Sequence, residues 1–301
     1  MPLQYRVFLH SYEGMSSTST LFYGERDAVL IDACQLLSDA HRLAAELLLM
    51  GKNLTHIYVS HFHPDHHFGL GVLEYAFPRA RIVDLPSVVK DIVFTTDDKI
   101  LMWGDFYGSN QPNRTVIPMP LAEDHLQVEG EELEFSDGWE GDCPNNTVVW
   151  VPSLGVLCAG DVVELDCHLW MVESDAARRV KWRDSIKRLR DFGARVIIPG
   201  HCSPEAYAHL GDTSSTSSVE FSLAYLDVYE DVLSGATTGE QLVAGMDRYF
   251  PEMKTEDFGL QWQARLLFPK SSPEWFARLP GEPGDIFLDP DGNYLGEPPR
   301  E

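Results

Sequence analysis

The sequence predicts an α/β fold in one large domain, followed by a helical extension. Short apolar or alternating runs of strand length alternate with longer segments in which apolar residues recur at helical spacing. Apolar residues make up 44% of the 301-residue chain, which is enough for a globular core. We therefore expect residues 1–210 to form the α/β domain and residues 211–301 to form the extension. The low-complexity run 211–218 is the expected linker between them.

Strands and helices are expected to alternate from the amino-terminal end. The predicted strands of this half are residues 5–11, 19–24, 27–33, 55–60 and 80–85. Residues 38–51 predict the first helix, because Ser38 is a typical N-cap and Gly51 a typical residue after a helix end. Residues 68–77 predict the second helix.

The second half repeats this pattern and then becomes helical. Residues 147–161 predict two strands joined by a turn, and residues 194–201 predict another buried strand that ends at a histidine. Between them, residues 176–193 predict an amphipathic helix. Residues 219–233 and 238–250 predict the helices of the extension, which could form a lid or a dimer face.

Composition and charge exclude several classes of function. The formal net charge is 23 − 47 = −24, so the backbone of a nucleic acid or an anionic membrane would be repelled. No run approaches the roughly 18 apolar residues of a membrane span, and the first residues do not have the pattern of a signal peptide. The five cysteines are scattered, which favours a reducing compartment. We expect a cytoplasmic protein that acts on a small molecule.

The densest chemical signal is the segment SHFHPDHHFG, residues 60–69, directly after a predicted buried strand. It holds four histidines and one aspartate: His61, His63, Asp65, His66 and His67. Residues two apart on extended backbone point to the same side, so His61 and His63 can share one space. The following proline turns the chain, and Asp65 and His66 then face a neighbouring space. Imidazole and carboxylate ligands suit zinc, and also iron or manganese.

The run HFHPDH resembles the signature of the metallo-β-lactamase superfamily, whose fold is an αββα sandwich. Three further motifs occur in the order of that family: LIDA with Asp32 before this run, and LCAGD with Asp161 and IIPGH with His201 after it. The resemblance covers roughly residues 15 to 205. The metal ligands that it implies are His61, His63, Asp65, His66, Asp161 and His201. It also implies that Asp32 fixes the orientation of a histidine ring.

The sequence departs from this family at one expected ligand. Where the family usually has a further metal-binding histidine, just before a strand like TVVW, this chain has Asn146. An amide oxygen is neutral and a weaker ligand than imidazole. We therefore expect one firm zinc site and one weakened site, with iron or manganese as other occupants. Asn146, Asp142 or Cys143 could complete the weakened site, and His125 and His168 are further candidates.

The resemblance implies a metal-dependent hydrolase that uses activated water on a small ester, lactone, thioester or related acyl substrate. Asp65 would orient the water and carry a proton. The weakened site keeps two alternatives open: a mononuclear-metal oxidoreductase similar to a sulfur dioxygenase, and a non-hydrolytic enzyme of secondary metabolism or a binding protein on the same fold. We expect two loop segments to form the wall of the substrate pocket. The side chains expected to line it are Trp103, Phe106, Tyr107, His168 and Trp170.

Overall fold

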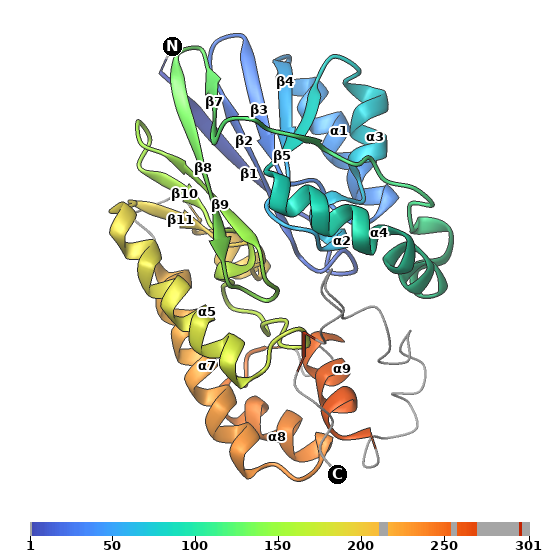
Figure 1. The fold of residues 1–301 in the computed structure, drawn as a ribbon, viewed down its shortest axis with the longest axis vertical. Helices are drawn as coiled ribbons and strands as arrows, with labels where there is room; N and C mark the ends of the chain where they lie inside the picture. Colours follow the sequence, from blue (N-terminus) through green and yellow to red (C-terminus); the bar gives the residue numbers. More distant parts are fainter. Residues whose placement is uncertain (1, 211–215, 254–257, 270–294, 297–301) are drawn as a thin grey trace.

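Two β-sheets stacked face to face form the centre of the molecule, and helices cover both outer faces (Figure 1). The computed structural model describes residues 2–210, 216–253, 258–269 and 295–296. These four layers form an αββα sandwich with a helical C-terminal part, so the predicted fold class is confirmed. Apolar side chains from both sheets, among them Phe22, Ile31, Phe135 and Val149, are buried in one core between the sheets.

The first sheet contains six strands in the order β1-β2-β3-β4-β5-β6. They are β1 (Gln4–Leu9), β2 (Thr18–Tyr23), β3 (Asp27–Ile31), β4 (Asn53–Tyr58), β5 (Arg81–Asp84) and β6 (Met119–Pro120). The first three strands pair antiparallel, and β3 to β6 pair parallel. The sequence predicted β1 to β5, because the inner strands are nearly continuous apolar runs, as is usual for strands covered on both faces.

The second sheet contains five strands in the order β11-β10-β9-β8-β7. They are β7 (His125–Val128), β8 (Glu131–Trp139), β9 (Asn146–Val151), β10 (Val156–Cys158) and β11 (Val196–Ile198). The sequence analysis did not identify the hairpin of β7 and β8. Its two turn residues, Glu129 and Gly130, have φ of 52° and 92°, which is the conformation of a tight two-residue hairpin turn.

Helices on the outer face of the first sheet come from the amino-terminal half of the chain. They are α1 (Leu37–Met50), α2 (Pro64–His67), α3 (Leu70–Ala76), α4 (Pro86–Tyr107) and the short 3₁₀ helix η1 (Gly108–Asn110). Leu43 and Leu47 of α1 are buried against Leu30 and Ile57 of the sheet. This burial of an apolar stripe is what holds a surface helix on a sheet.

Two expectations about these helices were wrong. The N-cap of α1 is Leu36 and not Ser38, which lies inside the helix. The Ser38 backbone N–H is instead satisfied by the side-chain oxygen of Asn110, at 3.0 Å. The second correction concerns residues 103–107, which we expected on a loop. They form the last part of α4, whose C-terminal boundary is Gly108 with φ of 55°.

The outer face of the second sheet is covered by the later helices (Figure 1). The elements of this half are η2 (Gly160–Val162), α5 (Ala176–Arg188), η3 (Leu189–Phe192), α6 (Pro204–Tyr207), α7 (Ser217–Gly235), α8 (Gly239–Tyr249) and α9 (Phe258–Leu267). Trp182 and Ile186 of α5 share one core with Tyr229 and Leu233 of α7. The boundary after residue 210 stays a prediction, and most of the expected linker lies outside the described residues.

Within the described part of the chain, every helix is too short or too polar to pass through a lipid bilayer. Cys34, Cys143, Cys158 and Cys202 are buried free thiols.

The ends of four strands place the chemically interesting residues at one edge of the sandwich. Asp32 comes directly after β3, and His61 follows shortly after β4. Asp161 and His201 follow β10 and β11 of the second sheet in the same way. The 3₁₀ turn η2 and the helix α2, with Pro64 at its start, reverse the chain at this edge. Residues distant in sequence therefore meet here.

Candidate metal centre

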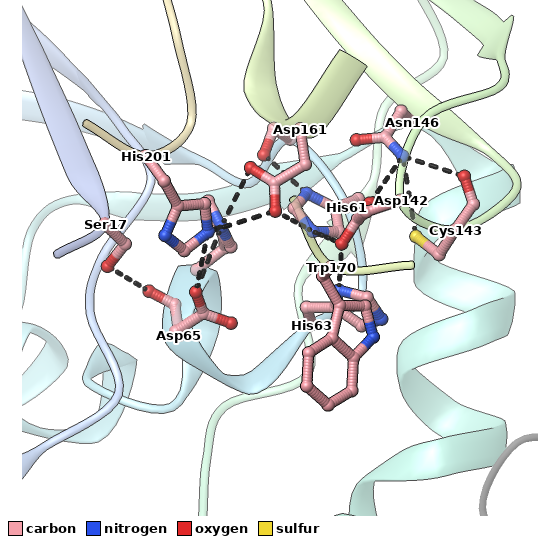
Figure 2. A network of polar contacts seen from close by, with 12 residues as sticks. Ser17, His61, His63, Asp65, Asp142, Cys143, Asn146, Asp161, Trp170 and His201 are labelled. Atoms are coloured by element: carbon pink, nitrogen blue, oxygen red, sulfur yellow. Dashed lines mark hydrogen bonds and ion pairs between the residues drawn. The ribbon is translucent and has the colours of Figure 1, made fainter. Parts of the chain in front are cut away.

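Four histidine rings converge at this edge (Figure 2). The ring centroids of His61 and His63 lie 4.9 Å apart, and those of His61 and His66 lie 4.2 Å apart. The rings of His66 and His201 are 5.3 Å apart, and their Nε2 atoms lie 3.4 Å from each other. The rings of His61, His63 and His66 are buried, and His201 is about one-eighth exposed.

A hydrogen bond holds the outer nitrogen of each ring. The four contacts are His61 Nδ1 with Ser60 Oγ (2.9 Å), His66 Nδ1 with Asp32 Oδ2 (3.0 Å), His201 Nδ1 with the Met15 carbonyl (2.7 Å), and His63 Nε2 with Glu173 Oε1 (2.9 Å). An acceptor at the outer nitrogen fixes both the ring orientation and the tautomer. The opposite nitrogen of each ring is therefore free to face the common space.

Asp32 and Met15 hold their rings from unusual backbone positions. Asp32 has φ of 61°, and the consecutive residues Met15 and Ser16 have φ of 68° and 53°. This left-handed region is uncommon for residues other than glycine and costs of the order of 1–2 kcal/mol per residue. Such strain is retained where the surrounding structure fixes it, and functional sites are a frequent case.

Two carboxylates lie among the inner nitrogens. Asp161 Oδ2 is 3.5 Å from His61 Nε2 and 3.1 Å from His201 Nε2, while its Oδ1 is 3.3 Å from His66 Nε2. Asp65 Oδ2 is 3.1 Å from His201 Nε2 and 3.4 Å from His66 Nε2. Asp161 thus lies between both halves of the cluster, and a Cβ atom on Gly200 would overlap its Oδ1. Only glycine at position 200 permits this approach.

The other candidate ligands are distributed differently. Asp142 joins the cluster, with its Oδ2 at 2.6 Å from His63 Nδ1 and 3.9 Å from His61 Nε2. Asn146 turns its amide nitrogen toward Asp142 and Cys143. His125 lies at the protein surface beside Asp124, on β7. His168 Nδ1 is 3.0 Å from the hydroxyl of Tyr225, and burial lowers the pKa of this histidine to about 4.

His67 has a structural environment. Its Nε2 lies 3.2 Å from the Phe62 carbonyl, and its Nδ1 lies 3.4 Å from Thr115 Oγ1. Burial lowers the pKa of His67 to about 3, so the ring stays neutral. It lies at the end of α2, away from the groups that could bind a metal.

The cluster fits a divalent cation. Three groups of side chains bring their ligand atoms within 4.8 Å of one another: His61/His63/Asp142/Cys143, His61/His66/Asp161 and Asp65/His66/His201. Among the described residues, His61 Nε2 and Asp161 Oδ1 are buried without a hydrogen-bond partner. A buried polar atom without a partner costs about 1–3 kcal/mol, and coordination of a cation would satisfy it.

The pKa shifts of the clustered side chains also favour a bound cation. Burial alone would lower the pKa of His66, but Asp161 and Asp65 raise it well above its usual value. Burial alone would raise the pKa of Asp161, but His201, His66 and His61 hold it well below its usual value. The carboxylates therefore stay ionised and attract positive charge, which is either protons on the imidazoles or a metal ion.

A cavity of about 920 Å³ opens onto the cluster. The aromatic and histidine residues predicted as pocket wall all line it: Trp103, Phe106, Tyr107, His168 and Trp170. The ring of Trp262, from α9, lies edge-on to those of Trp103 and Trp170, with centroids 5.5 and 5.4 Å away. The C-terminal helix α9 thus packs on the aromatic side of the cavity.

Among the charged residues of this cavity that sequence reasoning missed, three are buried: Lys99, Glu164 and Glu173. Glu173 contacts both His63 and Lys99. Burial raises the pKa of Glu164 well above its usual value, with a smaller opposing effect from His201. The available signal was the placement of Glu164 and Glu173 on either side of the aromatic segment after Asp161.

Comparisons with known proteins give one family and one fold. The model of the metallo-beta-lactamase superfamily matches residues 12–201. A metallo-beta-lactamase family protein from Thermus thermophilus has a TM-score of 0.57 at 21% identity, over 84% of this chain and 90% of that chain. The B3 metallo-beta-lactamase BLEG-1 has a TM-score of 0.53 at 15% identity, over 66% of this chain and 91% of that chain.

A metallo-beta-lactamase from Pontibacter korlensis has a TM-score of 0.50 at 18% identity, over 75% of this chain and 95% of that chain. At these identities the solved structures share the fold with this chain. No curated protein sequence matches it.

Proposed function

Since this chain belongs to the metallo-beta-lactamase superfamily, we propose that it is a metal-dependent hydrolase of a small ester, lactone, thioester or related acyl substrate. The proposed metal is zinc, with manganese or iron as other occupants. One observation carries the proposal: four imidazoles are each held by the outer nitrogen, with the inner nitrogens of His61, His66 and His201 turned to the carboxylates of Asp65 and Asp161, and that of His63 turned to Asp142. This arrangement is typical of a metal centre.

The residues proposed to hold metal are His61, His63, Asp65, His66, Asp161 and His201. A bound divalent cation would lower the pKa of coordinated water toward ~7 and polarise a substrate carbonyl. Asp65 lies at the face of the cluster that lines the cavity, with Oδ2 near His66 and His201. We assign it the role of orienting water and of carrying a proton to the leaving group, as a carboxylate beside the nucleophile can.

The cavity supports a small substrate with an apolar or ring-bearing part. Trp103, Tyr107 and Trp170 supply aromatic surface next to the cluster of histidine and aspartate side chains. Pockets that bind small molecules are typically apolar with a few polar groups that fix orientation. The relatives that are named metallo-beta-lactamases suggest cleavage of an acyl bond as the reaction class.

The test is an activity screen of the full chain, loaded separately with zinc, manganese and iron, against esters, lactones and acyl thioesters. His66→Ala is the blank, and Asp137→Asn, an exposed change on β8, is the matched control. We expect turnover by the parent and by Asp137→Asn, with a loss of at least about 10²-fold in His66→Ala. Equal activity of His66→Ala on every compound would contradict the assignment. Oxygen consumption with one iron would favour the oxidoreductase alternative.

A further inference from the structure

The loop between β8 and β9 brings a carboxylate to the position of the weakened metal site. Asp142 is fully buried, and its Oδ2 lies 2.6 Å from His63 Nδ1 and 3.9 Å from His61 Nε2. We propose that Asp142, and not Asn146, completes the metal position that His61 and His63 begin. This inference rests on the proposed metal-dependent function and names a ligand that the family motifs do not provide.

His63 Nδ1 and Asp142 Oδ2 face each other at the weakened site. Glu173 accepts a hydrogen bond from His63 Nε2 at 2.9 Å, so in the neutral ring, which is the form that binds a metal, the lone pair is on Nδ1. Asp142 Oδ2 and His63 Nδ1 are close, yet Oδ2 has no partner with hydrogen-bond geometry among the described residues. To coordinate one ion at about 2.0–2.2 Å from each, the two atoms would move apart by a few tenths of an ångström from their 2.6 Å separation.

Asn146 orients this carboxylate (Figure 2). Its amide nitrogen donates to the Cys143 carbonyl at 2.9 Å and to Asp142 Oδ1 at 3.2 Å. This bond occupies Oδ1 and leaves Oδ2 to the cluster. The amide oxygen of Asn146 lies near Gly160 and, like Asp142 Oδ2, is buried without a hydrogen-bond partner among the described residues. Asn146 is therefore a positioning residue in this proposal.

A glycine allows the loop to approach the shared aspartate. A Cβ atom on Gly141 would lie 2.6 Å from the Asp161 carbonyl oxygen and 2.8 Å from Asn146 Nδ2, which is too close for any side chain. The backbone N–H of Asp142 lies 3.3 Å from the same carbonyl. Residue 142 is thus held beside Asp161 by the main chain, independently of its own side-chain contacts.

Cys143 is the competing ligand in the same group. Its sulfur lies 3.5 Å from Asn146 Nδ2 and within 4.8 Å of the ligand atoms of His61, His63 and Asp142. Cys143 is buried, and a buried free thiol usually behaves as a small apolar side chain.

With Asp142 as ligand, the two metal positions have equal donor sets. One has His61, His63 and Asp142, the other has His66, His201 and Asp65, and both share Asp161. Each position then offers two imidazoles, one carboxylate of its own and one shared carboxylate. We expect two divalent ions of comparable affinity, and the oxygen-rich sets accept manganese or iron as well as zinc.

The experiment is calorimetric titration of the metal-free full chain with Zn²⁺ and, separately, Mn²⁺, with metal analysis after dialysis. The parent is expected to bind two equivalents, Asp142→Asn one, and Asp142→His two, because imidazole restores the ligand. Asn146→Ala should keep two equivalents, with the second weakened by about tenfold. Asp137→Asn, an exposed change on β8, is the control. Two equivalents in Asp142→Asn, or one in Asn146→Ala, would overturn the assignment.

Cobalt substitution distinguishes the Asp142 carboxylate from the Cys143 thiol as the metal ligand. The Co²⁺ form of the parent should lack the near-ultraviolet thiolate-to-cobalt band, and Cys143→Ser should leave the spectrum and the stoichiometry unchanged. A band that disappears in Cys143→Ser would assign the ligand to Cys143 instead. A parent chain that binds no metal would contradict the proposed function itself, whereas a parent with two ions and an unaffected Asp142→Asn contradicts this inference alone.

Discussion

The ammonium group of Lys99 lies 3.6 Å from Oε1 of Glu173, the same oxygen that accepts a hydrogen bond from His63. Both side chains are buried, with 5% and 1% exposure. Burial alone would raise the pKa of Glu173, but Lys99 and His63 lower it to about 2. The carboxylate therefore stays ionised and keeps the ring of His63 oriented. A lysine from α4 thus supports the orientation of His63, a proposed metal ligand from the loop after β4.

We predict that Lys99→Met destabilises the protein by up to about 3–5 kcal/mol, because it removes one of the two groups, the other being His63, that offset the buried charge of Glu173. Lys90→Met, at an exposed position of the same helix, should change the free energy of unfolding by less than about 0.5 kcal/mol. Urea unfolding of the metal-free proteins measures both. The double variant Lys99→Met/Glu173→Gln should recover part of the loss. Equal stability of the two single variants would contradict this account.

Asp32 offers a second test of ring orientation. Its Oδ2 accepts from His66 Nδ1 at 3.0 Å and from Ser60 Oγ at 2.9 Å, and its Oδ1 accepts from the Ser60 backbone at 2.6 Å. We predict that Asp32→Asn lowers metal affinity about 10–100-fold while the number of bound ions stays the same. Competition with a chelator of known affinity measures it. Asp137→Asn serves as the control. An unchanged metal affinity in Asp32→Asn would contradict the role of Asp32 in orienting the ring of His66.

The clustered residues that belong to the sequence motifs could be predicted, because each of them lies shortly after a strand. Asp32, His61, Asp161 and His201 follow β3, β4, β10 and β11, and the ends of these strands meet at one edge of the sandwich. The apolar runs therefore predicted both the sheet core and the place of the site. This is the part of the structure in which local pattern and tertiary position agree.

The remaining features depend on contacts across the fold. Lys99 contacts Glu173, which lies 74 positions further along the sequence (173 − 99). At the start of the first helix, the backbone N–H of Ser38 donates to the side-chain oxygen of Asn110. The aromatic residues before Gly108 were predicted on a loop because polar residues and glycines surround them, yet burial of Met102 and Trp103 keeps α4 helical. Tertiary packing overrides local propensity in such segments.

Stability should depend on pH through His10, whose Nε2 lies 2.7 Å from Ser19 Oγ. Burial lowers the pKa of His10 to about 4, below the value of about 6.5 in an unfolded chain. Between these values the unfolded chain binds the proton and the folded protein does not. The free energy of unfolding should therefore fall as the pH decreases from about 6.5 to 4, by up to about 3 kcal/mol.

His10→Gln tests this dependence, since its side-chain amide can still donate to Ser19. We expect the variant to lose less stability than the parent between pH 7 and pH 4.5, as measured by urea midpoints. His125→Gln, at the surface on β7, is the matched control and should follow the parent. Parallel pH curves for His10→Gln and the parent would exclude His10 as the source.

The last prediction concerns the charge of the substrate. Apart from the histidine–aspartate cluster and Glu173, the described lining of the cavity includes four exposed carboxylates, Glu13, Asp166, Glu205 and Glu252, and the buried Glu164, whose pKa is raised well above its usual value by burial. Among the described lining residues, the only lysine or arginine is Lys99, which is already paired with Glu173. An anionic substrate would therefore meet no uncompensated positive side chain and would be repelled during approach, whereas a neutral one would not.

We predict that kcat/KM for a neutral aryl ester exceeds that for the same ester with an added carboxylate by about tenfold at low salt. The ratio should shrink at 1 M salt, where the screening length is only about 3 Å. The double variant Glu13→Gln/Glu205→Gln removes two exposed charges at the cavity and should raise the rate on the anionic ester alone. Glu132→Gln, exposed on β8 and not part of the lining, is the control. A higher kcat/KM for the anionic ester than for the neutral one at low salt would contradict this prediction.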